Sequence, residues 1–234
     1  MFRGFRARPW VGVLLALGAS AALLGCGGSG DAGDARLSAE AQLGEKIFSD
    51  VSLSASGRQS CATCHDAARG HAANNALPAQ LGGPDGTLQG VRNTPGIRYL
   101  ASNTPFFFDE EGTPTGGFFW DGRAATLAEQ AAGPFLNPLE MANPDKASVI
   151  TKLAAAPYAA EFRRVYGDAI FSDVDGAYQR LTEALQRYQL EDAEFNAFTS
   201  KYDAYLRGTA QLSAQEARGL ALMPSDTPIQ PLLV

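Results

Sequence analysis

Two of the three cysteines and both histidines of this 234-residue chain stand within one short stretch, SCATCHDAARGH, which runs from Ser60 to His71. Cys61, Cys64 and His65 form the pattern C-x-x-C-H, the attachment signature of c-type haem. Two thiols three residues apart lie on one side of a helical turn, where each can add to a vinyl group of the haem. The next residue, histidine, then lies under the iron as its proximal ligand. The pattern predicts one covalently bound haem c.

Other uses of these residues stay open at this point. A zinc site would draw on Cys61, Cys64, His65 and His71, although structural zinc sites usually separate their ligand pairs by a dozen or more residues. A thioredoxin-type redox pair would need a preceding strand, and nothing upstream reads as one. Without a prosthetic group, the two cysteines would tend to close as a disulfide in an oxidising compartment.

The second axial face of a haem iron decides between electron transfer and activation of a bound molecule. The chain offers His71, Met141 and Met223 as candidate distal ligands. His71 follows His65 by only six residues, so the chain would have to wrap tightly around the haem edge to bring it there. A place near a propionate or in solvent is the alternative for His71. If no side chain binds, the position is open to peroxide.

Residues 1–25 have the pattern of an export signal, with arginines and no acid before an apolar run. The run is shorter than the roughly 20 apolar residues of a membrane span, which favours a cleaved signal. An uncleaved anchor helix is the alternative. The sequence LLGC, ending at Cys26, resembles the bacterial lipoprotein box. We therefore expect lipidation of Cys26, a flexible tether over 26–36, and a location in the periplasm at the membrane. A plain secretory signal with a chance cysteine is the alternative.

The formal net charge of −6 argues against nucleic acid as a partner, because the chain has no basic run. The length suits one domain, or one domain and a fragment of a second. The acidic balance would favour basic partners only weakly, by long-range steering.

Helical periodicity predicts helices both before and after the C-x-x-C-H segment. Residues 37–50 read as a helix with Ser38 as N-cap, and two short helices broken at Pro157 follow Pro144. Residues 173–190 predict a longer helix, and Ser213 with Glu216 predicts a capping box. The apolar face expected for the longer helix consists of Ala177, Leu181, Leu185 and Tyr188.

Residues 72 to about 145 are instead crowded with glycine and proline, so we expect long loops there. A covalently bound haem would supply much of the core that such loops lack. The fold prediction is therefore an all-α, c-type cytochrome-like haem domain with long Gly/Pro-rich loops. The expected apolar lining of the haem consists of Phe106, Phe107, Phe108, Phe118, Phe119 and Trp120.

Three stretches occur in order: LGEKIFSDVSLSASGRQSCATCHDAARG, GVRNTPGIRYL and FFWDGRAATLAEQAAGPFLNPLEMANP. Together they resemble the N-terminal half of the bacterial di-haem cytochrome c peroxidase family, over about residues 37–222. That family includes the di-haem enzyme that matures a tryptophan-derived quinone. The resemblance implies a peroxidase-type haem domain over 37–212. Its activity would be reduction of hydrogen peroxide to water, with electrons from a donor cytochrome c or another small redox protein.

The resemblance also assigns roles to single residues. In the family the first C-x-x-C-H holds the peroxide-reacting haem, and a distal Gln and Glu match Gln130 and Glu140. Pro134 matches the proline packed near the distal face, and Trp120 matches the tryptophan between the two haems. Asn93 matches a ligand of the inter-domain calcium, so a bound calcium ion is also expected.

Glu140 can be argued from chemistry as well. Splitting an O–O bond needs a proton moved from the inner to the outer oxygen, which a carboxylate with a raised pKa can do. Glu140 lies between Pro138 and Pro144, in a segment that cannot be a regular helix. A solvated surface residue is the alternative. For Arg123 the candidate partners are Asp121, which ranks first, and a haem propionate.

The sequence departs from the family after the capping box. The family continues into a second C-x-x-C-H domain, whereas no histidine follows His71 here. We therefore expect 213–234 to be the start of a truncated second haem domain. Asn93 would then lack calcium partners, and Trp120 would have no second haem to bridge. A mono-haem electron-transfer protein and an inactive truncated fragment stay open as alternatives to a peroxidase.

Overall fold

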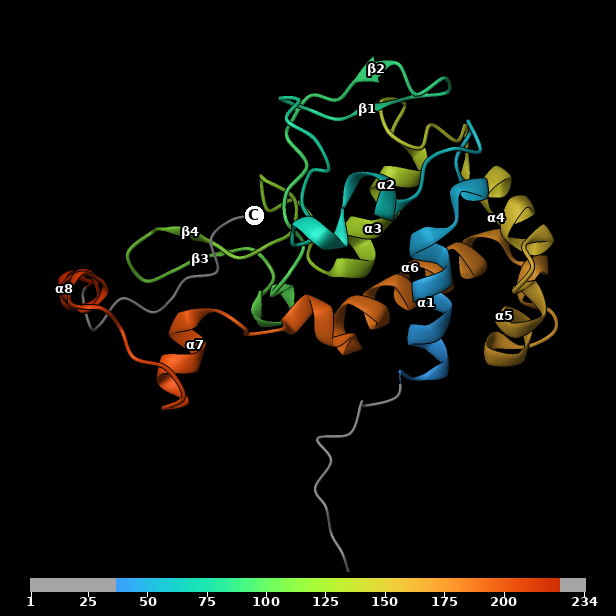
Figure 1. Cartoon of the computed structure of the whole chain (residues 1–234). Coiled ribbons are helices and arrows are strands. Elements are labelled where there is room, and N and C mark those ends of the chain that lie inside the picture. Colours follow the sequence, from blue (N-terminus) through green and yellow to red (C-terminus); the bar gives the residue numbers. More distant parts are fainter. Residues whose placement is uncertain (1–36, 224–234) are drawn as a thin grey trace, which may run out of the picture. The chain divides into compact units, whose positions relative to one another are not determined.

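The computed structural model describes residues 37–223 of the chain (Figure 1). The predicted export signal, the tether with Cys26 and residues 224–234 lie outside these residues. Among the helices that the structure describes, none is long and apolar enough to cross a membrane.

Helix α1 (Ala39–Ser49) begins where the sequence predicted. Ser38 Oγ accepts a hydrogen bond from the amide N–H of Ala41 at 3.1 Å, which satisfies a free donor of the first turn. Its apolar side chains recur at helical spacing and are buried, so one face of α1 packs on the core. That face includes Leu43, Ile47 and Phe48.

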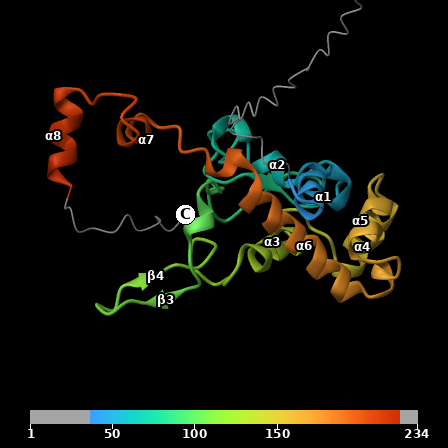
Figure 2. The same cartoon turned by 90° about the horizontal axis from the view of Figure 1, so that it is seen from below.

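Helix α6 (Val174–Glu191) is the central element of the helical part. It packs against α1, α3 (Leu127–Leu136) and α4 (Lys146–Ala155), as Figures 1 and 2 show. The single apolar face predicted for this segment is confirmed, because the residues at helical spacing are buried. Of the four predicted residues, Ala177, Leu181 and Leu185 are buried, and Tyr188 is partly buried and packs against the core. Tyr178 and Ala184 are buried as well.

The break at Pro157 is also confirmed. It separates α4 from α5 (Ala159–Tyr166), and Asp145 caps α4 by accepting a hydrogen bond from the Ser148 N–H at 2.7 Å. Helix α4 packs on α6, whereas α5 packs on α1 and α4 and adds Phe162 to the core.

Shorter helices join these elements. The 3₁₀ turns η1 (Val51–Leu53) and η2 (Ala67–Arg69) flank the one-turn helix α2 (Cys61–Cys64). Further 3₁₀ turns are η3 (Leu100–Ser102), η4 (Ile170–Ser172) and η5 (Ala193–Asn196). Helices α7 (Lys201–Leu206) and α8 (Ala214–Leu222) follow, and neither contains a buried residue. The capping box predicted before α8 is confirmed.

The prediction of an all-α fold needs a correction. The structure is rich in helix, but two antiparallel pairs of short strands lie between η2 and α3. β1 (Leu81–Gly82) pairs with β2 (Leu88–Gln89), and β3 (Phe107–Phe108) pairs with β4 (Pro114–Thr115). Each pair closes over a turn with a glycine at positive φ, Gly86 in the first and Gly112 in the second, a backbone region that favours glycine.

The close approach of α1 to α6 at Gly44 yields a stability prediction. A Cβ atom at this position would overlap the backbone carbonyl of Ala184. We expect Gly44→Ala to lower the free energy of unfolding by about 1–3 kcal/mol, because the helices would have to separate. Urea unfolding followed by circular dichroism measures this change.

Gly219→Ala in α8 is the matched control, since no atom lies within 4 Å of a Cβ there. We expect this variant to be as stable as the parent, or more stable by about 0.5–1 kcal/mol. Equal effects of the two substitutions would contradict the account of the α1–α6 contact.

Candidate haem site

A cavity of about 370 Å³ lies between the helices and the loops that precede α3. Its walls come from α1, α2, α3 and α6, from loop residues near 90–97 and 118–123, and from the turn at 137–141. The lining is mostly apolar, and the volume falls in the roughly 300–1,000 Å³ range of small-molecule and cofactor sites.

One wall carries the C-x-x-C-H residues. α2 is a single turn, closed by a hydrogen bond from the His65 N–H to the Cys61 carbonyl at 2.9 Å. The Ser60 N–H donates to Thr63 Oγ1 at 2.9 Å and holds the start of the turn. Cys61, Cys64 and His65 all line the cavity, as the predicted haem attachment requires.

The thiols of Cys61 and Cys64 favour their neutral form. Burial raises the pKa of Cys61 to about 12 and also raises the pKa of Cys64, because the protein interior disfavours a thiolate. Structural zinc is bound by thiolates. The described residues also contain no group of three or more His, Cys, Asp and Glu side chains that could hold a metal ion. Within the described residues, Cys61, Cys64, His65 and His71 therefore do not form a zinc cluster.

His65 is oriented by the chain that follows it. Its Nδ1–H donates to the backbone carbonyl of His71 at 3.0 Å, which leaves Nε2 unprotonated in the neutral ring. Burial lowers the pKa of His65 and favours that neutral ring. A neutral imidazole held through Nδ1 is the form that binds a metal through Nε2.

The side chain of His71 lies outside the cavity. It is 1% exposed, stacks on Phe195 with ring centroids 4.1 Å apart, and accepts a hydrogen bond from Arg98 Nε at 3.2 Å. To act as distal ligand, the His71 ring would have to leave the core, its stack on Phe195 and its hydrogen bond from Arg98. What His71 supplies in this structure is the carbonyl that holds His65, which the sequence interpretation did not foresee.

Three of the distal residues implied by the resemblance share the same cavity. Gln130 and Pro134 lie one turn apart on α3, and Glu140 lies in the turn that follows the helix. Thr126 caps α3 by accepting a hydrogen bond from the Glu129 N–H at 3.1 Å. The structure thus brings the thiols, His65 and these three side chains around one space.

Asn137 is a site residue that the sequence interpretation missed. Its Nδ2 donates to Glu140 Oε1 at 2.6 Å, and its Oδ1 accepts from the Leu139 N–H at 3.0 Å. The side chain of Glu140 lines the cavity but is exposed, as the alternative of a solvated residue had it. Surrounding protein still raises the pKa of Glu140 by disfavouring its charged form, while the Asn137 hydrogen bond and the charge of Arg123 oppose that rise. The sequence signal for this role is an asparagine directly before a proline at the end of a helix. The side chain of such an asparagine typically hydrogen-bonds the backbone of its own turn.

Trp120 and Asn93 meet at the edge of the cavity. Trp120 Nε1–H donates to the Asn93 carbonyl at 3.0 Å, and Asn93 Nδ2 donates to the Pro78 carbonyl at 3.4 Å. Calcium takes six to eight oxygen ligands, far more than Asn93 alone provides. A calcium site involving Asn93 therefore stays a prediction.

As expected, Arg123 pairs with Asp121. Arg123 Nη1 lies 2.7 Å from Asp121 Oδ1. Arg92 approaches the same carboxylate at 3.2 Å, and the Arg123 guanidinium lies 3.5 Å from the centroid of the Phe119 ring. The two arginines hold the pKa of Asp121 below its usual value, so this group is charged at the mouth of the cavity.

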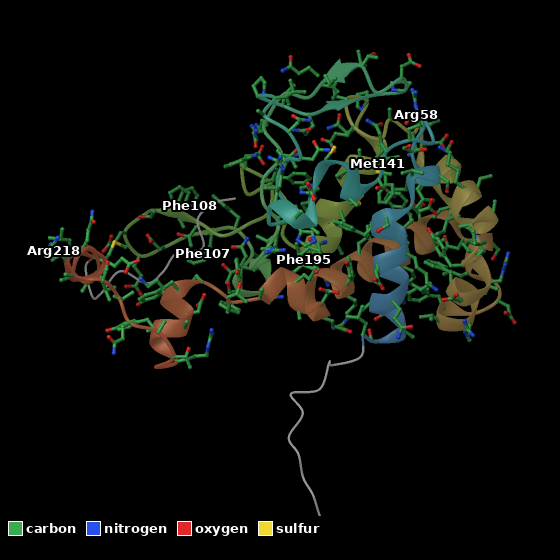
Figure 3. The ribbon with its side chains drawn as sticks, in the orientation of Figure 1. Arg58, Phe107, Phe108, Met141, Phe195 and Arg218 are labelled. Atoms are coloured by element: carbon green, nitrogen blue, oxygen red, sulfur yellow. The ribbon has the colours of Figure 1, made fainter. Side chains whose placement is uncertain are left out.

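Only half of the expected aromatic lining is found in the cavity. Phe118, Phe119 and Trp120 line it, whereas the preceding three phenylalanines do not. Those three belong to the β3–β4 hairpin or its base, and Phe108 is 65% exposed. Figure 3 shows Phe107 and Phe108 on this hairpin. The hairpin directs them away from the cavity, so that part of the predicted lining was wrong.

The residues around the cavity fit a covalently bound haem. Two neutral thiols and an imidazole with a free nitrogen stand on one wall, and apolar side chains form most of the remainder. Gln59 Oε1, which also belongs to the lining, is buried and has no hydrogen-bond partner among the described residues. An unpaired buried acceptor beside the thiols is consistent with a polar group that enters with a ligand.

Comparison with known proteins agrees with this description. The family model of di-haem cytochrome c peroxidase matches residues 38–211. The methylamine utilization protein MauG of Paracoccus denitrificans is 42% identical over 183 residues, which cover 76% of this chain and 47% of MauG. The cytochrome c551 peroxidase of Pseudomonas aeruginosa is 32% identical over 180 residues, covering 76% and 46%.

A solved structure is similar as well. The diheme peroxidase BthA from Burkholderia thailandensis superposes with a TM-score of 0.72 at 36% identity, over 78% of this chain and 45% of BthA. The chain thus spans about half the length of the relatives that it matches. Because the family model covers most of the described residues and includes the complete cavity wall of α2 and α3, the chain belongs to the di-haem cytochrome c peroxidase family.

Proposed function

We propose that the chain is an exported c-type haem protein that reduces hydrogen peroxide to water. One haem would be bound covalently through Cys61 and Cys64, with His65 as proximal ligand. Electrons would come from a donor cytochrome c or another small redox protein. The observation that carries the proposal is that Glu140 shares a cavity with the thiols and lies close enough for its charge to raise their pKa values.

The reaction consumes two electrons and two protons for each peroxide and yields two water molecules. The haem, when bound, supplies the iron that exchanges these electrons. Glu140 would take a proton from one peroxide oxygen and deliver it to the other oxygen. The second oxygen can then leave as a neutral water molecule. The surrounding protein raises the pKa of Glu140 toward the range that suits an acid and a base in turn.

Other lining residues would position the peroxide. The amide N–H of the Gln130 side chain can donate to a peroxide oxygen, and Pro134, which has no N–H, presents only apolar atoms there. Trp120 would stand at the cavity edge, on the side where electrons arrive from a second haem or a partner.

Location and anchoring are part of the proposal. Covalent haem attachment of this type takes place outside the cytoplasm, in agreement with the signal pattern of residues 1–25. A lipid on Cys26 would hold the domain at the membrane through the 26–36 tether. Calcium at Asn93 would require further oxygen ligands from outside the described residues.

A second candidate is a mono-haem electron carrier, and one observation favours it. Met141 is 4% exposed and lines the cavity, so its thioether would serve as the sixth ligand of such a carrier. Two axial side chains would give a low-spin spectrum that hardly responds to cyanide, whereas an open position would give a high-spin component that does.

Haem attachment can be tested directly. We expect the chain, co-expressed with a c-type haem attachment system, to gain the mass of one haem under denaturing conditions. The variant Cys61→Ala/Cys64→Ala should gain none, because no thioether can form. Cys26→Ala is the control and should keep the haem while losing any lipid. A covalent haem in the double variant would contradict the assignment.

The role of Glu140 predicts a loss of peroxide turnover. We expect Glu140→Gln to slow the reaction of the haem-loaded chain with hydrogen peroxide by about 10²–10⁴-fold, the usual contribution of a general acid–base. Stopped-flow spectroscopy and steady-state oxidation of reduced cytochrome c would measure it. Glu111→Gln, in the exposed turn of the β3–β4 hairpin, is the matched control and should leave the rate unchanged. Equal rates in Glu140→Gln and the parent would refute the role.

A further inference from the structure

Asn137 organises the turn that carries Glu140. α3 ends at Leu136, and Pro138 prevents the helix from continuing. The Asn137 carbonyl accepts hydrogen bonds from the N–H groups of Glu140 and Ala142, both at 3.0 Å. The Asn137 side chain then bonds the Leu139 N–H with its oxygen and Glu140 Oε1 with its nitrogen. One amide therefore fixes both the turn and the carboxylate.

The turn is also supported from behind by β1. The Gly83 N–H donates to the Glu140 carbonyl at 2.8 Å. A Cβ atom at Gly82 would overlap the Leu139 carbonyl, so the strand backbone lies directly against the turn. The backbone of Glu140 is thus held on one side, and its carboxylate is held through Oε1 by Asn137. Among the described residues, Oε2 has no hydrogen-bond partner.

We propose that Asn137 is the positioning residue of this site, which holds Oε1 of Glu140 so that Oε2 stays free to exchange a proton in the cavity. The inference deepens the proposed function and rests on it for the role of Glu140. Asn137 touches the carboxylate and is not assigned a proton-transfer step of its own. Its hydrogen bond is donated to a charged group, which is among the stronger kinds in proteins.

The charges that face Glu140 set the direction of the expected effect. Arg123, from the loop before α3, lowers the pKa of Glu140, as does the Asn137 amide. Cys61 and Cys64 face it from α2, but as thioethers they would no longer titrate. The residues of β1 that support the turn, Leu81 and Gly82, and the adjacent Gly83 carry no charge. Removal of the Asn137 donor destabilises the carboxylate, so the pKa of Glu140 should rise.

The experiment follows the protonation of Glu140 itself. Infrared titration of the haem-loaded chain, labelled with ¹³C in the glutamate carboxyl, reports the C=O stretch of the protonated group. Comparison with Glu140→Gln identifies its band. We expect Asn137→Ala to move the midpoint upward by about one pH unit, a tenfold change in the proton dissociation constant. Asn137→Asp keeps the acceptor for Leu139 but has no donor, and its negative charge should move the midpoint further upward.

Asn103→Ala is the matched control. This asparagine donates from Nδ2 to the Gly117 carbonyl, also at 2.6 Å, and does not line the cavity. Its variant should leave the Glu140 midpoint unchanged, which separates a specific effect from the loss of any loop hydrogen bond. Asn137→Asp provides the test if Asn137→Ala fails to fold. An unchanged midpoint in the folded Asn137 variants would overturn the proposal.

The same samples separate this inference from the proposed function. If the Asn137 variants move the midpoint while the parent does not react with peroxide, the positioning role stands and the peroxidase proposal fails. If the parent reacts and the midpoint does not move, the positioning role fails alone. If both hold, the acidic limb of the peroxide pH profile should move upward with the infrared midpoint.

Discussion

Helices α1 and α6 cross so closely at Gly44 that one added methyl group would overlap the Ala184 carbonyl. The helical walls of the cavity take their place from this contact. α1 brings Phe48 to the cavity, α6 brings Leu185, and α3, which packs on α6, carries the residues of the opposite wall. A glycine at the crossing lets the helix backbones approach, and the space for a large ligand is left beside them rather than between them.

A buried polar network transmits this arrangement to the turn after α3. Asn143 Nδ2 donates to the carbonyls of Leu53 at 2.8 Å and Phe135 at 2.9 Å. Lys152 Nζ bonds Asn143 Oδ1 at 2.7 Å and also contacts the Ser54 carbonyl. The loop after α1, the end of α3 and helix α4 are therefore tied together directly behind the turn. Such a satisfied network favours one arrangement, because any other would leave buried donors and acceptors unpaired.

The electrostatics of the cavity follow from the same enclosure. Burial raises the pKa values of Cys61 and Cys64 and lowers that of His65, so all three favour their neutral forms. The surrounding protein raises the pKa of Glu140 for the same reason. The charged side chains of the lining, Arg92, Asp121 and Arg123, are paired with one another. A macrocycle that filled this space would lower the local dielectric constant and strengthen the remaining polar contacts.

Local signals in the sequence were sufficient for features that depend on neighbouring residues alone. The spacing of Cys61, Cys64 and His65, the cap at Ser38 and the break at Pro157 are of this kind, since each is set within one turn of chain. Which loop residues face the cavity was decided only by the tertiary structure. Phe107 and Phe108 turn outward on a hairpin, and the ring of His71 enters the core while its carbonyl holds His65. The physical reason is that these positions depend on contacts between segments far apart in the chain, such as His71 with Arg98 and Phe195, which no local pattern encodes.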